Sequence, residues 1–338
     1  MTSRLTDMDA RRGNGEDVKM AEGYQSAASL VGQADIAILM CTYNGEAFLR
    51  EQLESFASQT CGSWKLYVSD DGSTDATRQI LAQYQQRWGA ERLQVFDGPG
   101  QGFANNFISL LKRPAVKGRF YAFSDQDDVW FSDKLERSLA CLVTTPAEKP
   151  ALYCSRTQLV DSARNAAGYS PLFSRPPSFR NALVQSLAGA NTMLINQAAR
   201  DVLMQLPEGA SIVAHDWLAY ILVTGCGGTV IYDPQASLEY RQHGDNLIGA
   251  NNSLKDRLKR LRKMLSGRFV KWNDANVQIL RAMAPLLTQE NRAILADFES
   301  GRRAGLSSRL CALRRSGVYR QTLVGNLTLV IAAFLARI

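Results

Sequence analysis

The chain has 338 residues, of which 46% are hydrophobic and 21% charged, a composition that is ordinary for a globular protein. This length is sufficient for one large domain with an appendage or for two domains. Its six cysteines include no C-x-x-C pair, which argues against a structural zinc site, a thioredoxin-like motif or a disulfide framework, and favours a reducing compartment. The net charge of +7 is uneven: from Leu254 onward 17 Lys/Arg outnumber 5 Asp/Glu by 12, so residues 1–253 carry about −5. This asymmetry favours an anionic partner for the C-terminal part.

The segment Met1–Gln33 is polar, charged and glycine-rich, and it lacks the apolar core of a signal peptide. We therefore predict a disordered tail over residues 1–34. From Asp35 onward short apolar runs alternate with segments of helical periodicity, which predicts a parallel α/β sheet with helices on both faces. The predicted strands of this half are Ile36–Cys41, Lys65–Ser69, Leu93–Phe96 and Arg119–Ser124. The predicted helices between and after them are Glu46–Gln59, Ser73–Trp88, Gly102–Lys112 and Ser132–Val143.

The second half is less regular. Its predicted strands are Leu152–Ser155, Gly189–Asn196, Gly228–Tyr232 and Ala236–Arg241, and a short helix is predicted at Asp216–Thr224. The segment Leu254–Leu287 is predicted to be helical and basic until Pro285 interrupts it. The apolar run Leu323–Leu335 is shorter than the ~20 residues of a transmembrane helix, so we expect a packed or interfacial helix.

Three carboxylates follow the fourth predicted strand within four residues, in the run SDQDDVW at 124–130. Closely spaced carboxylates repel one another unless a cation neutralises them, and such oxygens are preferred ligands of Mg²⁺ or Mn²⁺. The alternative is an exposed acidic turn, which the flanking Phe123 and Trp130 disfavour. Because ligands of parallel sheets bind at the carboxyl ends of strands, we expect a metal that holds a nucleotide diphosphate here. Asp127 is the first candidate ligand and Asp125 the second.

Polar clusters also follow the first two strands. Thr42, Tyr43 and Asn44 offer hydroxyls, an aromatic face and an amide that suit a base and a ribose, although Asn-Gly is also a common turn signal. Asp70 and Asp71 follow the second strand, where one aspartate can cap the next helix while the other contacts a nucleotide.

The two histidines of the chain each lie in a polar motif. His215 precedes Asp216, whose carboxyl group at a helix start can act as a proton acceptor or as an N-cap. His243 can ligate the metal, contact a phosphate or be a core histidine. The glycine patterns of dinucleotide-binding proteins, P-loops and nucleophile elbows do not occur after the first strand or elsewhere.

Taken in this order, the motifs TYN at 42–44, DDGSTD at 70–75, DQDDVW at 125–130, HDW at 215–217 and YRQH at 240–243 resemble family 2 of the inverting glycosyltransferases. The S-D-Q-D-D-V-W form is most similar to bacterial rhamnosyltransferases of O-antigen and cell-wall polysaccharide assembly. The resemblance covers about residues 35–250. It implies the GT-A fold, a Rossmann-like mixed sheet with helices on both faces. The implied organisation is a catalytic domain at 35–253 with a helical basic extension at 254–338. Cys41 departs from the proline found in many members, and we expect this to alter packing rather than chemistry.

The resemblance also implies roles for the matching residues. Asp216 would be the catalytic base, and the metal ligands would be Asp125, Asp127 and His243. The donor contacts would be Thr42, Tyr43, Asn44, Asp70, Asp71, Asp125 and Gln126. The acceptor pocket would be lined by Trp130, Gly189, Asn191, His215 and Trp217.

The implied reaction is a single displacement that moves a sugar, with rhamnose as the first choice, onto a hydroxyl of a saccharide or lipid-diphosphate-linked acceptor. The donor would be dTDP-rhamnose or a UDP-sugar, and the cofactor Mg²⁺ or Mn²⁺. We expect a cytoplasmic protein, peripheral on the inner face of the bacterial cytoplasmic membrane.

The basic segment after Leu254 has leucines interleaved with lysines and arginines, as in a helix that lies on an anionic membrane. A helical appendage packed on the catalytic domain with a solvated basic face is the equal alternative. We expect no nucleic-acid partner, because neither an RNP-like motif nor zinc-finger spacing occurs. Two other functions remain open: a nucleotidyltransferase that makes sugar nucleotides, and an inactive binding protein.

Overall fold

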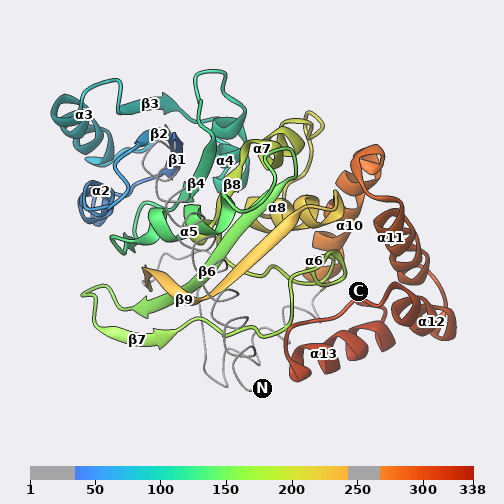
Figure 1. The fold of residues 1–338 in the computed structure, drawn as a ribbon. Helices are drawn as coiled ribbons and strands as arrows, with labels where there is room; N and C mark the ends of the chain where they lie inside the picture. The colour runs from blue at the N-terminus through green and yellow to red at the C-terminus, as the bar shows by residue number, and fades with distance from the viewer. Residues whose placement is uncertain (1–34, 243–266) are drawn as a thin grey trace, which may run out of the picture.

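The computed structural model describes residues 35–242 and 267–338. The predicted tail at 1–34, the basic segment at 254–265 and His243 lie outside the described residues. Within them, a twisted sheet fills one part of the molecule and a group of helices from the end of the chain lies beside it (Figure 1). The predicted boundaries between tail, catalytic domain and extension stay predictions.

The described residues form one nine-stranded sheet in the order β3-β2-β1-β4-β8-β6-β9-β5, with β7 paired to β6. The strands are β1 (Ile36–Thr42), β2 (Trp64–Asp70), β3 (Leu93–Asp97), β4 (Phe120–Ser124), β5 (Val129–Trp130), β6 (Ala151–Val160), β7 (Ala166–Tyr169), β8 (Leu194–Asn196) and β9 (Thr229–Arg241). The first four strands are parallel, as the strand–helix alternation predicts. The parallel pattern predicted from the alternation of the first half does not extend to every later strand, since β8 runs antiparallel to both β4 and β6, and β5 runs antiparallel to β9. The mixed sheet implied by the family resemblance is confirmed.

Strand register places the candidate residues at one edge. Thr42 pairs with Asp70 across β1 and β2, and Met40 pairs with Ser124 across β1 and β4. Since β8 is antiparallel to β4, the start of β8 meets the carboxyl end of β4, where the Phe123 amide donates to the Met193 carbonyl at 3.2 Å. The turn before β8 is therefore brought to the acidic loop.

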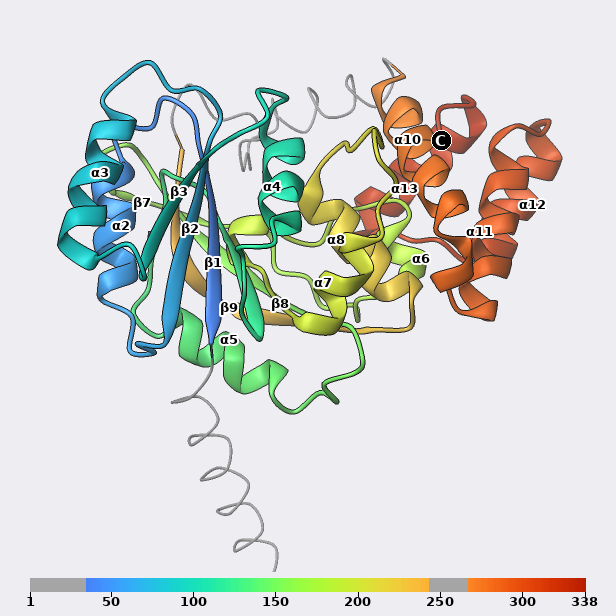
Figure 2. The ribbon, with the colours of Figure 1, turned by 90° about the horizontal axis from the view of Figure 1, so that it is seen from above.

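Both faces of the central strands are buried, as parallel strands require. In β1, Ile36, Ile38 and Met40 face one apolar cluster while Ala37 and Leu39 face the other. On the first side lie α2 (Leu49–Ala57), α3 (Thr77–Trp88) and α5 (Lys134–Leu142). On the second side lie α4 (Phe103–Lys112), α6 (Phe179–Ala182), α7 (Gln197–Met204) and α8 (His215–Gly225). Figure 2 shows these two groups of helices on opposite sides of the strands.

The C-terminal helices are α10 (Arg268–Ala282), α11 (Gln289–Arg302), α12 (Leu306–Ser316) and α13 (Leu323–Phe334). They extend the apolar cluster of α8, because Phe269, Leu280 and Leu329 belong to the same buried set as Leu218. Pro285 lies in a short 3₁₀ turn, Ala284–Leu286, that separates α10 from α11, as its position predicts. Across residues 35–242 and 267–338, no helix has both the length and the apolar character that a bilayer crossing demands.

Candidate active site

The loops after β1 and β2 are locked together by buried polar groups. Thr42 donates its hydroxyl to Asp70 at 2.8 Å, and Arg78 donates from Nε to the same carboxylate at 2.7 Å. Ser73 donates to Asp70 through its backbone amide at 3.0 Å. Burial raises the pKa of Asp70, but the hydrogen bonds from Ser73, Arg78 and Thr42 outweigh it and hold the pKa below its usual value. The Asp70 carboxylate is therefore a charged anchor for this edge of the sheet.

Asp71 and Asn44 are more accessible. Asp71 accepts from the amides of Gly100 at 2.7 Å and Gly102 at 3.1 Å, so it orders the loop before α4. Asn44 has a positive φ of 48°, and its side chain accepts from the Thr74 amide at 2.8 Å. Tyr43 is 60% exposed at the tip of the same loop. These three residues form the open part of the edge.

Three carboxylates meet where β4 ends. Asp125 and Asp127 follow β4, while Asp216 lies in the first turn of α8. Burial raises the pKa of Asp125 to about 7, with the charges of Asp127 and Asp216 adding to the effect. Burial likewise raises the pKa of Asp216 to about 6. Asp125 therefore lies close enough to Asp127 and Asp216 for their negative charges to oppose its ionisation, in addition to the effect of burial.

Asp128 faces the interior, as the aromatic residue that follows it suggests. Asn191 donates to its Oδ2 at 2.6 Å, and its Oδ1 has no partner among the described residues. Burial, followed by the charges of Asp127 and Asp125, raises the pKa of Asp128 well above its usual value. The buried Lys134 lies nearby, with Nζ 4.2 Å from the centre of the Trp130 ring, and burial lowers its pKa to about 7 against the opposing effect of Asp128. Asn191 therefore fixes the acidic loop to the turn before β8.

Two further side chains hold the backbone around the carboxylates. Gln126 accepts from the Tyr43 amide at 2.9 Å and donates to the Tyr43 carbonyl at 3.0 Å, which joins the loops after β4 and β1. Arg241, at the end of β9, is almost fully buried. It donates from Nε to the Asp127 carbonyl at 3.0 Å and from Nη2 to Glu51 at 2.9 Å. The acidic loop is thus fastened from both sides.

The predicted acceptor residues divide into two groups. Gly189 is exposed, whereas His215 is 3% and Trp217 6% exposed. His215 stacks on Phe107 with ring centres 4.0 Å apart, and neither of its nitrogens has a partner among the described residues. Trp217 donates its indole N–H to the Ala182 carbonyl at 2.7 Å. His215 and Trp217 are therefore both part of the buried core around α8, and their contact with an acceptor stays a prediction.

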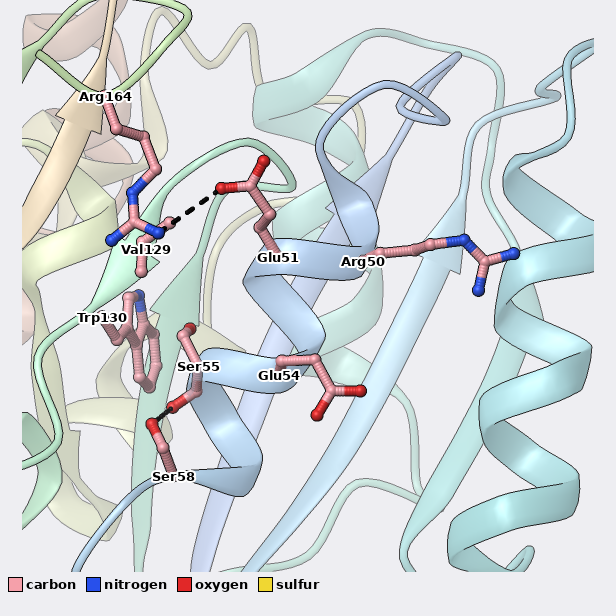
Figure 3. A pocket seen from close by; sticks show the side chains of 8 residues that line it. All are labelled: Arg50, Glu51, Glu54, Ser55, Ser58, Val129, Trp130 and Arg164. Atoms are coloured by element: carbon pink, nitrogen blue, oxygen red, sulfur yellow. Dashed lines mark hydrogen bonds and ion pairs between the residues drawn. The ribbon is translucent and has the colours of Figure 1, made fainter.

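Trp130 lines a cleft of about 370 Å³ between α2 and the turn that joins β6 to β7. Its ring is nearly buried, 4.7 Å from that of Phe56 and edge-on to it. Figure 3 shows Glu51 and Arg164 reaching toward each other across this cleft, an ion pair of 3.7 Å, while Arg50 points away from Trp130. Glu51 therefore links the cleft to Arg241 and, through it, to the acidic loop.

The donor set suits a divalent cation. Asp125 and Asp127 offer hard oxygen ligands, and a bound cation would oppose the effects that raise the pKa of Asp125, namely its burial and then the charges of Asp127 and Asp216. No cluster of three or more His, Cys, Asp or Glu able to hold a metal occurs within residues 35–242 and 267–338, and His243 lies outside them. Two carboxylates fit an ion that takes its other ligands from a diphosphate and water.

The sequence reasoning did not identify Arg241, Gln52 or Lys134 as supports of the site. Arg241 stood in the quoted YRQH motif, and a lone arginine amid neutral residues at a strand end was the available signal. The buried Gln52, on α2, accepts from the Ser124 hydroxyl at 2.6 Å and from Trp130 Nε1 at 3.3 Å, and donates to the Asp128 carbonyl. Nothing in its local sequence distinguishes it from an exposed helical glutamine.

Comparisons with known proteins show the family of the chain. The model of the family described as Glycosyl transferase family 2 matches residues 37–194. The dTDP-rhamnosyl transferase RfbG of Shigella flexneri is 31% identical over 238 residues, which are 66% of this chain and 78% of that protein. The putative teichuronic acid biosynthesis glycosyltransferase TuaG of Bacillus subtilis is 35% identical over 107 residues, 31% of this chain and 40% of that protein.

Among solved structures, S. aureus TarS residues 1–349 in complex with UDP-GlcNAc aligns with a TM-score of 0.51 at 18% identity, over 83% of this chain and 90% of that one. GalNAc-T7 with UDP, GalNAc and Mn²⁺ aligns with a TM-score of 0.52 at 10% identity, over 85% of this chain and 55% of that one. At these identities the likeness concerns the fold alone. The match to the family model and the alignment with the Shigella flexneri protein, which covers 78% of that protein, decide against the nucleotidyltransferase alternative. The chain belongs to glycosyltransferase family 2, with the GT-A fold.

Proposed function

We propose that the protein transfers a sugar from a nucleotide-diphosphate donor to a hydroxyl group of a saccharide or lipid-linked acceptor in cell-surface polysaccharide synthesis. The observation that carries this proposal is the meeting of Asp125, Asp127 and Asp216 at the carboxyl end of β4. Rhamnose from dTDP-rhamnose is the first candidate, because the relative of Shigella flexneri is named as a dTDP-rhamnosyl transferase. A UDP-sugar is the second, since the TarS structure holds UDP-GlcNAc.

The donor contacts divide by accessibility. Tyr43, Asn44 and Asp71 lie on the open edge and are proposed to contact the base and ribose. Thr42 and Asp70 are buried and bonded to each other, so we assign them the task of holding that edge rather than touching the donor. Gln126 is proposed to act similarly, through its two bonds to the backbone of Tyr43.

Asp125 and Asp127 would hold Mg²⁺ or Mn²⁺. When bound, such an ion would neutralise the charge that develops on the leaving diphosphate. Arg241 keeps the Asp127 backbone in place. Gln126, the residue before Asp127, bonds to the backbone of Tyr43 in the loop after β1. Preorganised carboxylates of this kind lose little entropy when the donor binds.

Asp216 is proposed as the general base. It would accept the proton of the acceptor hydroxyl while that oxygen attacks the anomeric carbon. Its raised pKa of about 6 suits this task, because the carboxylate is ionised at neutral pH and is still more basic than an exposed aspartate. One displacement inverts the anomeric configuration, and the residues described require no covalent sugar–enzyme intermediate.

A cytoplasmic location, peripheral on the inner membrane of a bacterium, fits this function. No disulfide joins the six cysteines, all of which lie within the residues that the structure describes, and a reducing compartment permits this. Assays with candidate acceptors would identify the acceptor molecule and the glycosidic linkage that is formed.

The test is release of nucleoside diphosphate from a panel of nucleotide sugars with Mn²⁺ and candidate acceptors. Asp216→Asn should lower turnover by about 10²-fold or more while donor affinity stays nearly unchanged. Asp201→Asn is the matched control, because it removes the charge of an exposed carboxylate on α7. Asp201 lies near Tyr121, at the start of β4, whereas the proposed active site lies at the end of that strand. Wild-type turnover in the Asp216 variant would remove this residue from the role of base. Release with none of the panel would overturn the proposed function.

A further inference from the structure

Helix α13 turns an apolar face outward. Its exposed large side chains recur at helical spacing and comprise Leu323, Val324, Leu327, Val330, Ile331, Phe334 and, just beyond the helix, Leu335. At 3.6 residues per turn these positions span an arc of about 140°. The opposite face, with Leu329, Ala332 and Ala333, is buried against the body of the protein. The helix thus packs on one side and leaves a second apolar side uncovered.

This arrangement is the reverse of an ordinary surface helix, whose outward face is polar. The segment Leu323–Phe334 contains no charged residue at all. Leu323 is 89% exposed and Leu327 62%, so these are not side chains lying half-covered in a groove. Contiguous apolar surface of this kind marks a contact site for a partner or a membrane.

The chain segment that contains α13 has charged side chains of one sign only. From Ser300 to Ile338 the chain has seven arginines and no lysine, aspartate or glutamate. Arg337 follows α13 directly, and Arg309 on α12 donates to the Ala333 carbonyl at 2.8 Å. Arg303, Arg314 and Arg337 are exposed, and no ion pair joins them to a carboxylate in the part of the chain that the structure describes. An apolar face with an arginine-rich surround is the pattern of a helix that lies in the headgroup region of an anionic bilayer.

We propose that the exposed face of α13 docks on an anionic phospholipid membrane. A second copy of the chain is a poorer occupant, because pairing two such faces would bring the two arginine sets together. Nucleic acid is also a poorer occupant of this face, because a phosphate backbone offers no apolar surface against which leucine and phenylalanine side chains could be buried. The proposal deepens the proposed function by naming the surface on which the enzyme would meet a lipid-linked acceptor, and vesicle binding tests it without any sugar transfer.

The attachment of α13 to the rest of the protein is rigid. Asn181, on α6, donates to the Tyr319 carbonyl at 2.9 Å, and the buried Gln321 donates to the Arg175 carbonyl at 3.1 Å. Both bonds join the segment before α13 to the catalytic part of the chain. Docking through α13 would therefore fix the orientation of the active site relative to the membrane instead of tethering it loosely.

The experiment is co-flotation of the full-length protein with vesicles of phosphatidylglycerol and phosphatidylcholine, compared with phosphatidylcholine alone. We expect binding to the anionic vesicles only, weakened by salt. Leu327→Glu should lower the partition coefficient by about tenfold or more, because one large apolar contact is lost and a like charge faces the lipid. The matched control is Leu172→Glu, which makes the same change at a similarly exposed position before α6, 57% against 62%.

Each outcome bears on the proposal. Failure of the wild type to float at low salt, or equal flotation of the Leu327 variant, overturns it. Equal binding to neutral vesicles overturns the electrostatic part. A wild-type dimer that dissociates on Leu327→Glu, without vesicle binding, assigns the face to a second copy instead. Diphosphate release with a soluble acceptor should be unchanged in this variant, so a failed docking test leaves the proposed function standing, and a failed activity assay leaves the docking result standing.

Discussion

Replacing Arg241 with methionine should destabilise the protein and loosen the acidic loop. The guanidinium group makes three bonds that methionine cannot: to the Asp127 carbonyl at 3.0 Å, to the Ser162 carbonyl at 2.6 Å and to Glu51 at 2.9 Å. Methionine keeps much of the apolar stem that packs near Phe48, over whose ring the guanidinium carbon lies at 4.5 Å. The variant therefore isolates the polar bonds.

The magnitude follows from the exposure of each partner. The Asp127 carbonyl is half-buried, so loss of its charged donor costs about 1.5–3 kcal/mol. Ser162 lies in an exposed turn where water replaces the donor, and that bond contributes little. The Glu51 side chain is 44% exposed, so the screened pair contributes about 1 kcal/mol at most. We expect a loss of about 2–4 kcal/mol in the free energy of unfolding.

Urea unfolding of the variant and the wild type measures this difference, with Glu51→Gln as a control that removes the charge of Glu51 from its exposed pairs with Arg241 and Arg164. The control should lie within about 1 kcal/mol of the wild type. Calorimetric titration of donor with Mn²⁺ adds a second readout, in which Arg241→Met should bind more weakly and Glu51→Gln nearly normally. A methionine variant as stable as the control, with wild-type donor affinity, would show that Arg241 does not hold the acidic loop.

Three further expectations concern titration and the metal. Asp127→Asn should remove the Mn²⁺ dependence of donor binding, measured calorimetrically with and without the metal; an unchanged dependence would count against Asp127 as a ligand. The pH profile of kcat/KM should rise through about pH 6 as Asp216 loses its proton, and a profile flat from pH 5 to 8 would exclude it as the base. Burial lowers the pKa of His215 to about 3, so the folded state binds fewer protons than the unfolded state, whose histidine titrates near ~6.5; this contribution to stability is complete above that pH and is lost as the pH falls. The difference in unfolding free energy between the wild type and His215→Leu should therefore change by about 2 kcal/mol from pH 7 to pH 5, and identical slopes in urea unfolding would contradict a buried neutral histidine.

The first half of the fold was predictable because each element has a local pattern. Ile36 to Thr42 is an uninterrupted apolar strand, and the apolar residues of α2 recur at helical spacing. The predicted N-termini of this half lie within two residues of the observed ones except at two helices. The helix expected from Glu46 begins at Leu49, and the helix expected from Ser73 begins at Thr77, because Ser73 and Thr74 bond to Asp70 and Asn44 instead.

The second half depends on contacts that lie far apart in sequence. We predicted two strands, Gly228–Tyr232 and Ala236–Arg241, yet β9 is one strand that continues between them through Pro234. The interruption is a bulge in β9: its pairing with β6 passes from Ser155 opposite Asp233 to Arg156 opposite Ala236, so the extra residues, Pro234 and Gln235, belong to β9. Similarly, much of the strand predicted at Gly189–Asn196 is a 3₁₀ turn, Ala190–Thr192, and only Leu194–Asn196 pairs with β4.

For the site, the acidic residues could be predicted while their supports could not. A carboxylate after an apolar strand is visible in the sequence itself. The partners of Arg241 are 79, 114 and 190 residues away, so only the folded chain shows them. The burial of His215 and Trp217 was equally hidden, because an aromatic residue beside a polar motif is compatible with a pocket wall and with a core.

The acidic residues at this edge of the sheet differ in how well the protein stabilises their charged forms. Asp70 is charged and fully bonded, whereas Asp125 and Asp216 have raised pKa values and lie close to each other. Arg241, Gln126 and Asn191 bind backbone atoms or the buried Asp128, so they fix the loop without neutralising Asp125 or Asp216. Burial and neighbouring negative charges therefore still disfavour the charged form of Asp125 in the folded protein. A positively charged ligand would stabilise that form, and this stabilisation adds to the free energy of binding. Ligands that bring positive charge to this edge should therefore stabilise the whole fold, since they bind the folded state alone.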